Sequence, residues 1–540
     1  MLAFSYRVVR PLVKSGASMA HSFISAGLAL LLLTSSNATG ARITKSPSLR
    51  SLEDSQSEQA RSAATALEEF DFERIWSDQT YAETMLRHID VMTPLVAADQ
   101  EGAAAFTGMR GMILAALDRG DESKAAIRAV ATSGAADPHP YVLAWAAASE
   151  LPDPDLMLEV VEAIARDVDK EGRPAALVAL APEIIWPLIG HFREKKQEAQ
   201  RYRLTEALVD MDWPGDTDID ARDSLRMDLV DRRLEQGNRS AAERLARTVT
   251  APAAFLPLIL MRKYDGLLDS PASSLDHFNR LLSDHDQQTA SALADDPRNY
   301  MKVLTRAQFL RGQGREDEAA SILAPFTSDV PGTHAHDERG MWLINEAAYA
   351  LLALGRNEEA LGPMSQLVKM DMAASPDLIG PSINYAEMLR RAGRPGESFA
   401  HAEQLAKQEA YANPYGRMWI KSAAACSLAD LGRREEAIAR LHAMEAGRDD
   451  NPAALMRAML CLDELDAAEQ LTLERLGSDE PKDMILALQD YRPGGANSGV
   501  DASLYQRLLK LRERPAVAGA LDRVGRRLTL PLSRIYYGGL

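Results

Sequence analysis

The richest group of potential metal ligands lies in the segment Thr333 to Glu338, which reads THAHDE. Two histidines one residue apart, His334 and His336, precede an aspartate and a glutamate, and such a pair can bind zinc from a strand or a loop. A hydrolase of this kind needs a further aspartate and histidine in register, which HAHDER lacks. We therefore predict an exposed polar loop after Pro331, with a metal-dependent hydrolase as the alternative.

No other pattern in the sequence indicates catalysis. The chain contains no phosphate-binding glycine loop and no G-x-S-x-G, H-E-x-x-H or C-x-x-C motif. Single serines, acids and histidines are common, but spacing distinguishes none of them. We therefore predict a protein that is not an enzyme, with no cofactor and no metal site.

The only two cysteines are Cys426 and Cys461, which lie in successive segments predicted to be helical. They could form a disulfide in an oxidising compartment. Relative to the turns that follow them, however, they are about one helical turn out of step. The spacing therefore favours two buried free thiols, and a disulfide stays open as the alternative.

A repeated glycine predicts the elements that position these residues. Six glycines are each followed five residues later by a small residue, at intervals of 117, 77, 41, 38 and 39 residues. A helix that ends at glycine and restarts with a small residue one turn in predicts two closely packed helices. The two long intervals are near multiples of the short ones and could hold degenerate units. The six pairs are Gly120 and Ala125, Gly237 and Ala242, Gly314 and Ala319, Gly355 and Ala360, Gly393 and Ser398, and Gly432 and Ala437.

The four clearest units share further positions before the glycine. Alanine lies seven residues before it and leucine four before it, so both fall on one helix face. A proline follows each second helix, where it can end one hairpin and start the next. The alanines are Ala307, Ala348, Ala386 and Ala425, and the leucines are Leu310, Leu351, Leu389 and Leu428.

This combination of residues resembles the tetratricopeptide repeat (TPR) family. The resemblance is strong over 301–447 and clear at 109–138 and 226–252, with further units at 452–476 and, without glycine, near Ala199 and Ser274. It implies an all-α fold, a right-handed superhelical solenoid of antiparallel helix hairpins. The chain departs from the family in having leucine where an aromatic is usual, and in units longer than about 34 residues.

The resemblance also implies a function. Family members are generally binding scaffolds that hold a peptide or helix in a concave groove lined by first helices. On that pattern the groove positions lie thirteen, ten and six residues before the glycine, together with residues just before it. The tryptophans there could anchor a partner, or could equally fill the core. The groove residues are then Trp342, Asn345, Tyr349, Glu387, Arg390, Trp419 and Ser422.

The charge of the chain excludes one class of partner. Of the formal net charge of −17, residues 1–41 carry +3 and residues 501–540 carry +5, which leaves −25 for residues 42–500. An acidic body argues against nucleic acid, because phosphate contacts need clustered lysine and arginine. The basic C-terminal region could cap the array, or could dock on an acidic partner, on the array's own acidic surface or on an anionic membrane.

The N-terminal 41 residues have the layout of a secretory signal peptide, with three basic residues, an apolar run and small residues. We therefore expect a periplasmic or secreted protein that binds a protein or peptide of unknown identity. An uncleaved, inner-membrane anchored assembly subunit is the alternative. The expected regions are a signal peptide at 1–41, a flexible leader at 42–66, degenerate repeats at 67–300, clear repeats at 301–490, and capping helices with a tail at 491–540.

Overall fold

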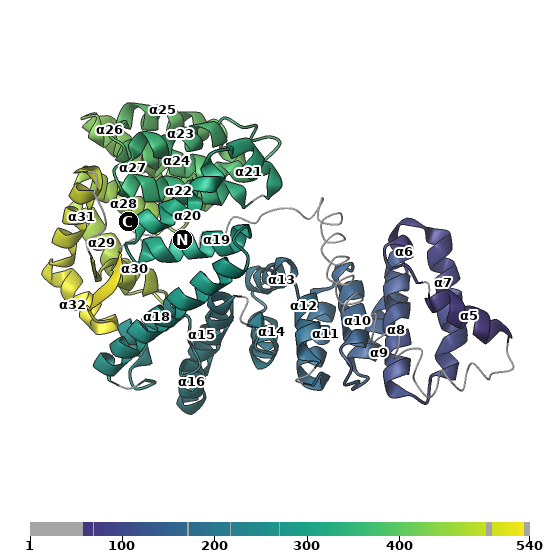
Figure 1. The fold of residues 1–540 in the computed structure, drawn as a ribbon. Coiled ribbons are helices and arrows are strands. Elements are labelled where there is room, and N and C mark those ends of the chain that lie inside the picture. Colours follow the sequence, from purple (N-terminus) through teal and green to yellow (C-terminus); the bar gives the residue numbers. More distant parts are fainter. Residues whose placement is uncertain are drawn as a thin grey trace. The chain divides into compact units, whose positions relative to one another are not determined.

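The described residues of this chain fold almost entirely as α-helices (Figure 1). They contain 28 α-helices and two short strands, which confirms the predicted all-α class. The chain divides into an N-terminal unit that ends at Thr250 and a C-terminal unit that begins at Ala251. The predicted signal peptide lies outside the described residues. A computed structural model describes residues 58–68, 70–169, 172–215, 218–268, 270–337, 339–492 and 499–533.

The N-terminal unit is a run of helices around one aliphatic core, in which Trp145 and Trp213 are buried. Its helices are α5 (Glu58–Glu68), α6 (Arg74–Ser77), α7 (Gln79–Met92), α8 (Gln100–Ala116), α9 (Gly120–Ala131), α10 (His139–Ser149), α11 (Pro154–Asp167), α12 (Arg173–Ala179), α13 (Pro182–Glu194), α14 (Glu198–Asp210), α15 (Ile219–Glu235) and α16 (Arg239–Ala246).

Helix α5 corrects the predicted leader at 42–66, because its first nine residues fall inside that segment. The serines of the segment hide an apolar face with helical spacing at positions 60, 63, 64 and 67. Ala60 and Ala63 on this face are buried, and the helix packs against α7. Burial of the alanine face therefore orders residues that composition alone suggested would be flexible.

The C-terminal unit contains the clear repeats and the only strands among the described residues. The strands pair in parallel, with Asp490 opposite Thr529. The elements are α17 (Pro252–Leu260), α18 (Pro271–Asp295), α19 (Tyr300–Gly312), α20 (Glu316–Thr327), α21 (Val330–His336), α22 (Gly340–Ala353), α23 (Asn357–Leu367), α24 (Ile379–Arg391), α25 (Pro395–Ala406), α26 (Pro414–Asp430), α27 (Arg434–Met444), α28 (Pro452–Leu462), α29 (Leu465–Leu476), α30 (Lys482–Ala487), β1 (Asp490–Arg492), α31 (Gly499–Arg512), α32 (Pro515–Val524) and β2 (Thr529–Ser533).

Five helix pairs follow one another from α19 to α29. We call α19, α22, α24, α26 and α28 the first helices; each packs against the second helix that follows it, and against the first helix of the next pair. In the first four pairs the turn residue is a glycine with φ between +73° and +77°, as at Gly355, a conformation in which a side chain is strained. Asp463, at φ +61°, takes this place in the fifth pair. The small residue five positions after each turn residue is fully buried: Ala319, Ala360, Ser398, Ala437 and Ala468.

The N-terminal unit has the same turn, but the register predicted at Gly120 and Ala125 is wrong. The left-handed residue is Asp118, at φ +57°, whereas Gly120 begins α9 and Ala125 is exposed. The buried small residue is Ser123, whose hydroxyl donates to the Gly111 carbonyl at 2.7 Å. Ser398 makes the same bond to the carbonyl twelve residues before it, at 2.6 Å. Aspartate tolerates the left-handed conformation, so the turn does not require the nearby glycine.

The units predicted without glycine have different outcomes. Near Ala199, α13 and α14 form a hairpin whose turn residue is Lys196, at φ +56°. Near Ser274, α17 packs against α18, a helix of 25 residues in which Ser274 is buried, and the left-handed Gly266 lies in the connection between them. Gly237 is left-handed and Ala242 fully buried, as their pattern predicts.

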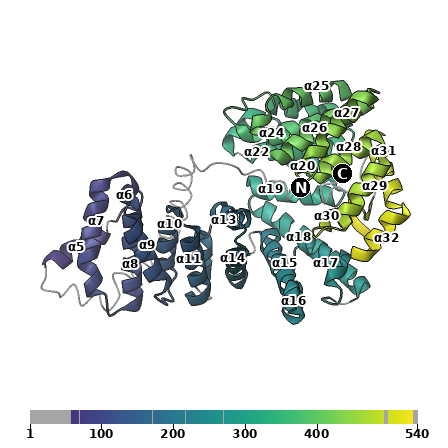
Figure 2. The same cartoon turned by 180° about the vertical axis from the view of Figure 1, so that it is seen from behind.

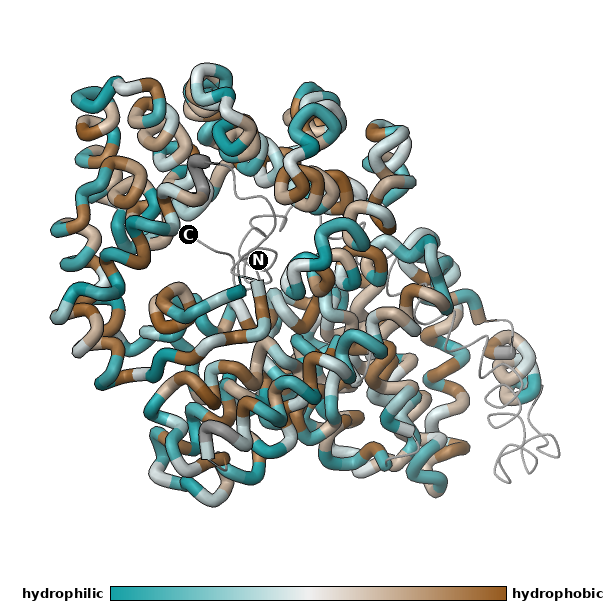
Figure 3. The backbone as a smooth tube through the Cα atoms, turned by 60° about the vertical axis from the view of Figure 1, so that its left-hand side comes forward, coloured by the Kyte–Doolittle hydropathy of each residue, from teal (hydrophilic) through white to brown (hydrophobic). Residues whose placement is uncertain are grey.

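Hydrophilic and hydrophobic residues alternate along the helices of the chain, as Figure 3 shows. Among the described residues, no single helix has both the length and the apolar character needed to span a membrane. The consecutive helices α12 and α13 together have the length and apolar composition of a membrane span, but the chain bends by 72° between them.

Candidate functional site: a charged cluster across the first helices

Equivalent positions on consecutive first helices bring the predicted groove residues together with others. Counting six residues back from each turn residue gives Gln308 on α19, Tyr349 on α22, Glu387 on α24, Cys426 on α26 and Arg457 on α28. Because first helices pack side by side, these positions form a row across them. The charged and aromatic residues of this row, together with the side chains that contact them, are called the first-helix cluster. Its members are Arg311, Glu346, Tyr349, Glu387, Arg390, Arg391, Trp419, Asp430 and Arg457.

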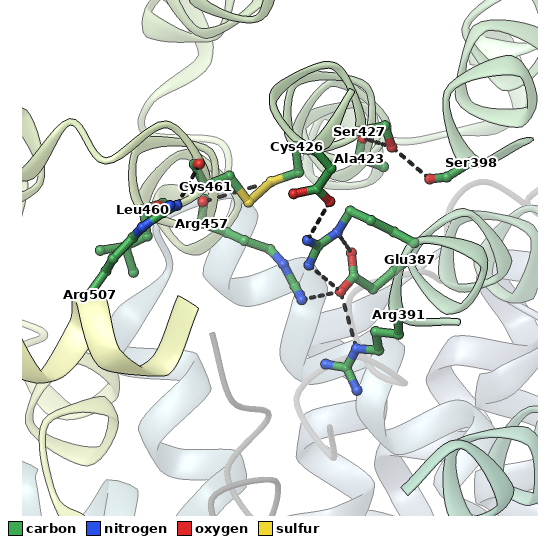
Figure 4. The surroundings of a disulfide bond; sticks show 12 residues. Glu387, Arg391, Ser398, Ala423, Cys426, Ser427, Arg457, Leu460, Cys461 and Arg507 are labelled. Carbon is green, nitrogen blue, oxygen red and sulfur yellow. Dashed lines mark hydrogen bonds and ion pairs between the residues drawn. A yellow bond between two sulfur atoms is a disulfide. The ribbon is translucent and has the colours of Figure 1, made fainter. Parts of the chain in front are cut away.

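Glu387 is the centre of this cluster (Figure 4). Its carboxylate accepts two hydrogen bonds from Arg390, each 2.9 Å, and one of 3.1 Å from Arg391 on the same helix. It also pairs with Arg457 of α28, two hairpins further along the chain. Arg390, which is 1% exposed, reaches forward to Asp430 of α26 at 3.1 Å. Glu387 therefore connects α24 with α28, and its partner Arg390 connects α24 with α26.

The electrostatics of Glu387 follow from these contacts. Burial alone would raise its pKa, but the surrounding guanidinium groups outweigh burial and hold the pKa well below its ordinary range. Glu387 is therefore ionised at every pH at which the protein would act. A buried network of this kind is costly to disrupt, because removing one member leaves another charge without its partner.

Aromatic rings flank the charges. The Tyr349 ring lies under two guanidinium groups, those of Arg311 at 5.0 Å and Arg391 at 5.7 Å from its centroid. Burial raises the pKa of Tyr349 to about 12, so its hydroxyl stays protonated. Trp419 faces the guanidinium of Arg457 at 5.8 Å. At these distances each ring attracts its guanidinium group by a cation–π interaction.

The predicted groove residues differ in how accessible they are. Asn345 and Ser422 are fully buried, as is Arg390, so they lie beneath the surface that a ligand would meet first. Asn345 accepts a hydrogen bond of 3.0 Å from Asn384 on the next first helix. Trp342 is half-buried and packs on Gly380 of α24, where a Cβ would lie 3.0 Å from its ring. One part of the Trp342 ring therefore packs between the first helices α22 and α24.

Cys426 and Cys461 form a disulfide, so the expectation of free thiols is wrong. Their Cα atoms lie 5.2 Å apart, on α26 and α28. Cys426 is six residues before its turn residue and Cys461 is two before its own, because the two helices are offset along their axes by about one turn. The two cysteines differ by about one helical turn in their distance from the turn residues, which argued against a disulfide. The helices are displaced by the same amount, so the two sulfur atoms meet. No cysteine of the chain is free.

Sequence analysis missed several members of the cluster: Arg311, Glu346, Asp430 and Arg457. Arg311 and Arg390 both lie three residues before a turn glycine, which is a signal that the sequence does carry. Arg457 was hidden because its turn residue is Asp463 rather than glycine. The pair of Arg311 with Glu346 joins α19 to α22, and no local pattern indicates it.

The segment around His334 and His336 forms the short helix α21, which corrects the predicted loop. An aspartate N-cap, Asp329, begins the helix by accepting from the Gly332 amide at 3.1 Å. The two imidazoles have other neighbours: His334 Nε2 lies 3.3 Å from Ser375 Oγ, and the His336 ring packs against Tyr300. Glu338 lies outside the described residues. Within the described ranges, no three His, Cys, Asp or Glu side chains are grouped as metal ligands.

Comparison with known proteins adds no relative. Neither the models of protein families nor the curated protein sequences match this chain. The likeness to tetratricopeptide repeats therefore depends on residues of this chain alone.

Proposed function

We propose that this chain is a non-catalytic protein-interaction scaffold of the tetratricopeptide type. In this proposal the helix hairpins form a right-handed superhelical solenoid, and the first helices line its concave groove. The recurring left-handed turn residue, with a buried small residue five positions later, supports the hairpin geometry. The packing of each first helix on the next supports a continuous surface.

The observation that carries the proposal is the row six positions before the turns. A structural core would fill this row with aliphatic side chains, whereas four of its five members are glutamine, tyrosine, glutamate and arginine, and the fifth is the disulfide-bonded Cys426. Tyr349, Trp419 and Glu387 keep part of their side chains accessible and would contact a partner peptide or helix. The buried members Asn345, Arg390 and Ser422 would set the spacing of the helices below them.

The proposed location is periplasmic or secreted, with an inner-membrane anchored form as the alternative. The disulfide supports it, because disulfides persist in oxidising compartments and both cysteines of this chain are paired. The formal charge of −25 over residues 42–500 favours a protein partner over nucleic acid.

The proposal is tested by affinity capture with the purified chain from a periplasmic extract of the organism that encodes it. The variant Tyr349→Ala with Trp419→Ala is compared with the parent and with Tyr411→Ala, an exposed tyrosine on the short η5 turn (Glu409–Tyr411). Circular dichroism establishes that each variant is folded.

We expect the parent and Tyr411→Ala to capture the same protein, and the double variant to lose it. Equal capture by all three would place binding elsewhere and contradict the proposed groove. If no protein is captured by a folded parent, the scaffold function itself is wrong.

A further inference from the structure

The C-terminal part of the chain runs from the last hairpin back to the first helices. We call residues 499–533, which comprise α31, α32 and β2, the strap. At one end, Arg507 of α31 donates hydrogen bonds to the carbonyls of Leu460, at 2.7 Å, and Cys461, at 2.6 Å (Figure 4). The strap therefore covers the end of α28, where the disulfide lies.

The strap's arginines pair with acids of the same unit. Arg514 contacts Asp466 and Glu469 of α29, and Arg527 contacts Asp490. Of the docking partners that the sequence left open, the array's own acidic surface is the one that these contacts support.

A second set of contacts joins the strap to the start of the unit, about 260 residues away in sequence (Figure 2). The amide of Arg526 donates to the Leu260 carbonyl at 2.9 Å, and its guanidinium donates to the Ile259 carbonyl at 2.6 Å. The same guanidinium pairs with Asp265, and Arg262 donates to the carbonyl of Asp522. We call these contacts the seam.

Strand β2 completes the connection. Leu530 and Leu532 are buried, and the Ser533 hydroxyl donates to the Arg311 carbonyl at 2.9 Å. The strap thus contacts both ends of the first-helix cluster, α19 through Ser533 and α28 through Arg507.

We infer that the strap closes the C-terminal unit into a ring, and that opening of the seam controls access to the first-helix cluster and to the disulfide. The backbone contacts of the seam involve the buried residues Ile259 and Leu260 and the bridge between Met261 and Gly525. The ion pair of Arg526 with Asp265, in contrast, is partly exposed. Hydrogen bonds and an ion pair each contribute little net free energy, so the seam opens more easily than the aliphatic core that holds the hairpins. The two-stranded pairing of β1 with β2 adds little rigidity of its own.

The disulfide provides a readout that needs no partner protein. Cys426 is fully buried and Cys461 is 8% exposed, so an attacking thiolate reaches the sulfurs only when covering residues move. Dithiothreitol supplies two electrons and two protons as it cyclises to its own disulfide, and the chain gains two thiols. The rate of thiol release therefore measures how often the covering residues open.

The experiment compares reduction rates of the oxidised full chain, of Arg526→Ala, and of the control Arg440→Ala. Arg440 pairs with Glu403 at 3.0 Å between two second helices, away from the seam. Arg526→Ala loses the charge-assisted hydrogen bond to the Ile259 carbonyl and the partly exposed ion pair with Asp265. We expect this variant to be reduced at least about tenfold faster. Arg440→Ala should be reduced at the parent's rate.

Urea distinguishes seam opening from global unfolding. Local opening exposes little surface, so reduction through it depends weakly on urea, whereas reduction through the unfolded state depends steeply. Equal rates for Arg526→Ala and Arg440→Ala would overturn the inference. A steep urea dependence in Arg526→Ala, matching that of global unfolding, would overturn it as well.

Discussion

Two sets of arginine–glutamate pairs in the C-terminal unit use the same groups in different surroundings. At four successive turns, the arginine after the glycine forms a bidentate pair with the glutamate three residues later. These turn pairs are largely exposed; Glu359 is 60% exposed and Glu436 is 57% exposed. In the first-helix cluster, Glu387 is 13% exposed and Arg390 is 1% exposed. The turn pairs are Arg315–Glu318, Arg356–Glu359, Arg394–Glu397 and Arg433–Glu436.

The difference shows which charged residues hold helices together and which merely recur once in each repeat. The turn pairs are local, screened by water and contribute little to stability. The cluster pairs join helices that lie up to 70 residues apart, and their charges cannot return to water if a partner is lost. Position, not residue type, therefore decides what an arginine does in this chain.

The largest effect is expected on removing one member of the cluster. Arg390→Ala leaves Asp430 and Glu387 without their shared partner and should lower the free energy of unfolding by about 3–5 kcal/mol. Urea unfolding followed by circular dichroism measures the change. Arg433→Ala, at a turn, is the matched control and should leave the unfolding midpoint within experimental error. Similar decreases in the free energy of unfolding for the two variants would contradict the different roles assigned to the cluster pairs and the turn pairs.

The disulfide links α26 and α28, two of the first helices that the cluster pairs also join. Its removal tests how much a covalent link between first helices contributes to stability. Cys426→Ser with Cys461→Ser opens a loop closed over a sequence separation of 35 residues. The loss of loop-closure entropy predicts a decrease of about 3–4 kcal/mol in the free energy of unfolding. The same assay, run with and without a reductant, checks it. A double variant as stable as the oxidised parent would mean that the thiols are free, as the sequence had favoured.

Acid should affect neither set of pairs between pH 7 and 5, because the pKa values of Glu387, Glu359 and Glu436 are all lowered. Two groups should contribute to the pH dependence in this range. Burial, and then the charge of Asp218, raises the pKa of Asp220 to about 7, so its contribution to stability increases as the pH falls.

His285 of α18, which is buried beside Phe309, contributes in the opposite sense. Burial first, and then the charge of Arg306, lowers the pKa of His285 to about 4.

The sign of the His285 effect follows from its two pKa values, about 6.5 in the unfolded chain and about 4 in the folded one. Between these values the imidazole binds more protons in the unfolded state, so the contribution of His285 to stability falls as the pH drops from 6.5 towards 4. The expected loss is about 3 kcal/mol over this range. His285→Phe should remove this contribution in urea titrations, and an unchanged slope would show that another group is responsible.

The smallest expected effect concerns the turns themselves. Gly355 has φ +75° and open space around its Cα, so Gly355→Ala tests backbone strain alone. We expect a loss of about 1–2 kcal/mol. Gly362 lies within α23, also in open space, and Gly362→Ala should stabilise by about 0.5–1 kcal/mol. Thermal unfolding of the two variants should move in opposite directions; movement in the same direction would contradict the assigned turn.

Local chemistry made part of this fold predictable. Glycine turns with a small residue five positions later located most hairpins, because both features act within one turn of chain. The turn at Asp118 could have been found from another local signal, since Arg119 and Glu122 form the same pair as the other turns. The Arg-x-x-Glu spacing followed by a small residue therefore gives the register at Asp118, where glycine misplaces it, whereas at Gly237 only the glycine marks the turn.

The candidate site was harder to predict because its contacts are not local. The row containing Tyr349 and Glu387 followed from counting back along each helix. The contact of Glu387 with Arg457, like the disulfide, depends on how far neighbouring helices slide along each other, and side-chain packing sets that offset. The seam at Arg526 joins residues about 260 apart, for which no periodicity gives a signal.

The most direct test of the scaffold proposal is site-specific photo-cross-linking in cells. A benzophenone amino acid is placed at Trp419, on the first-helix cluster, or at Tyr411, eight residues earlier and 41% exposed. We predict that position 419 becomes covalently linked to one partner protein and that position 411 does not. Cross-links from position 411 to the same partner, with none from position 419, would contradict binding at the first helices.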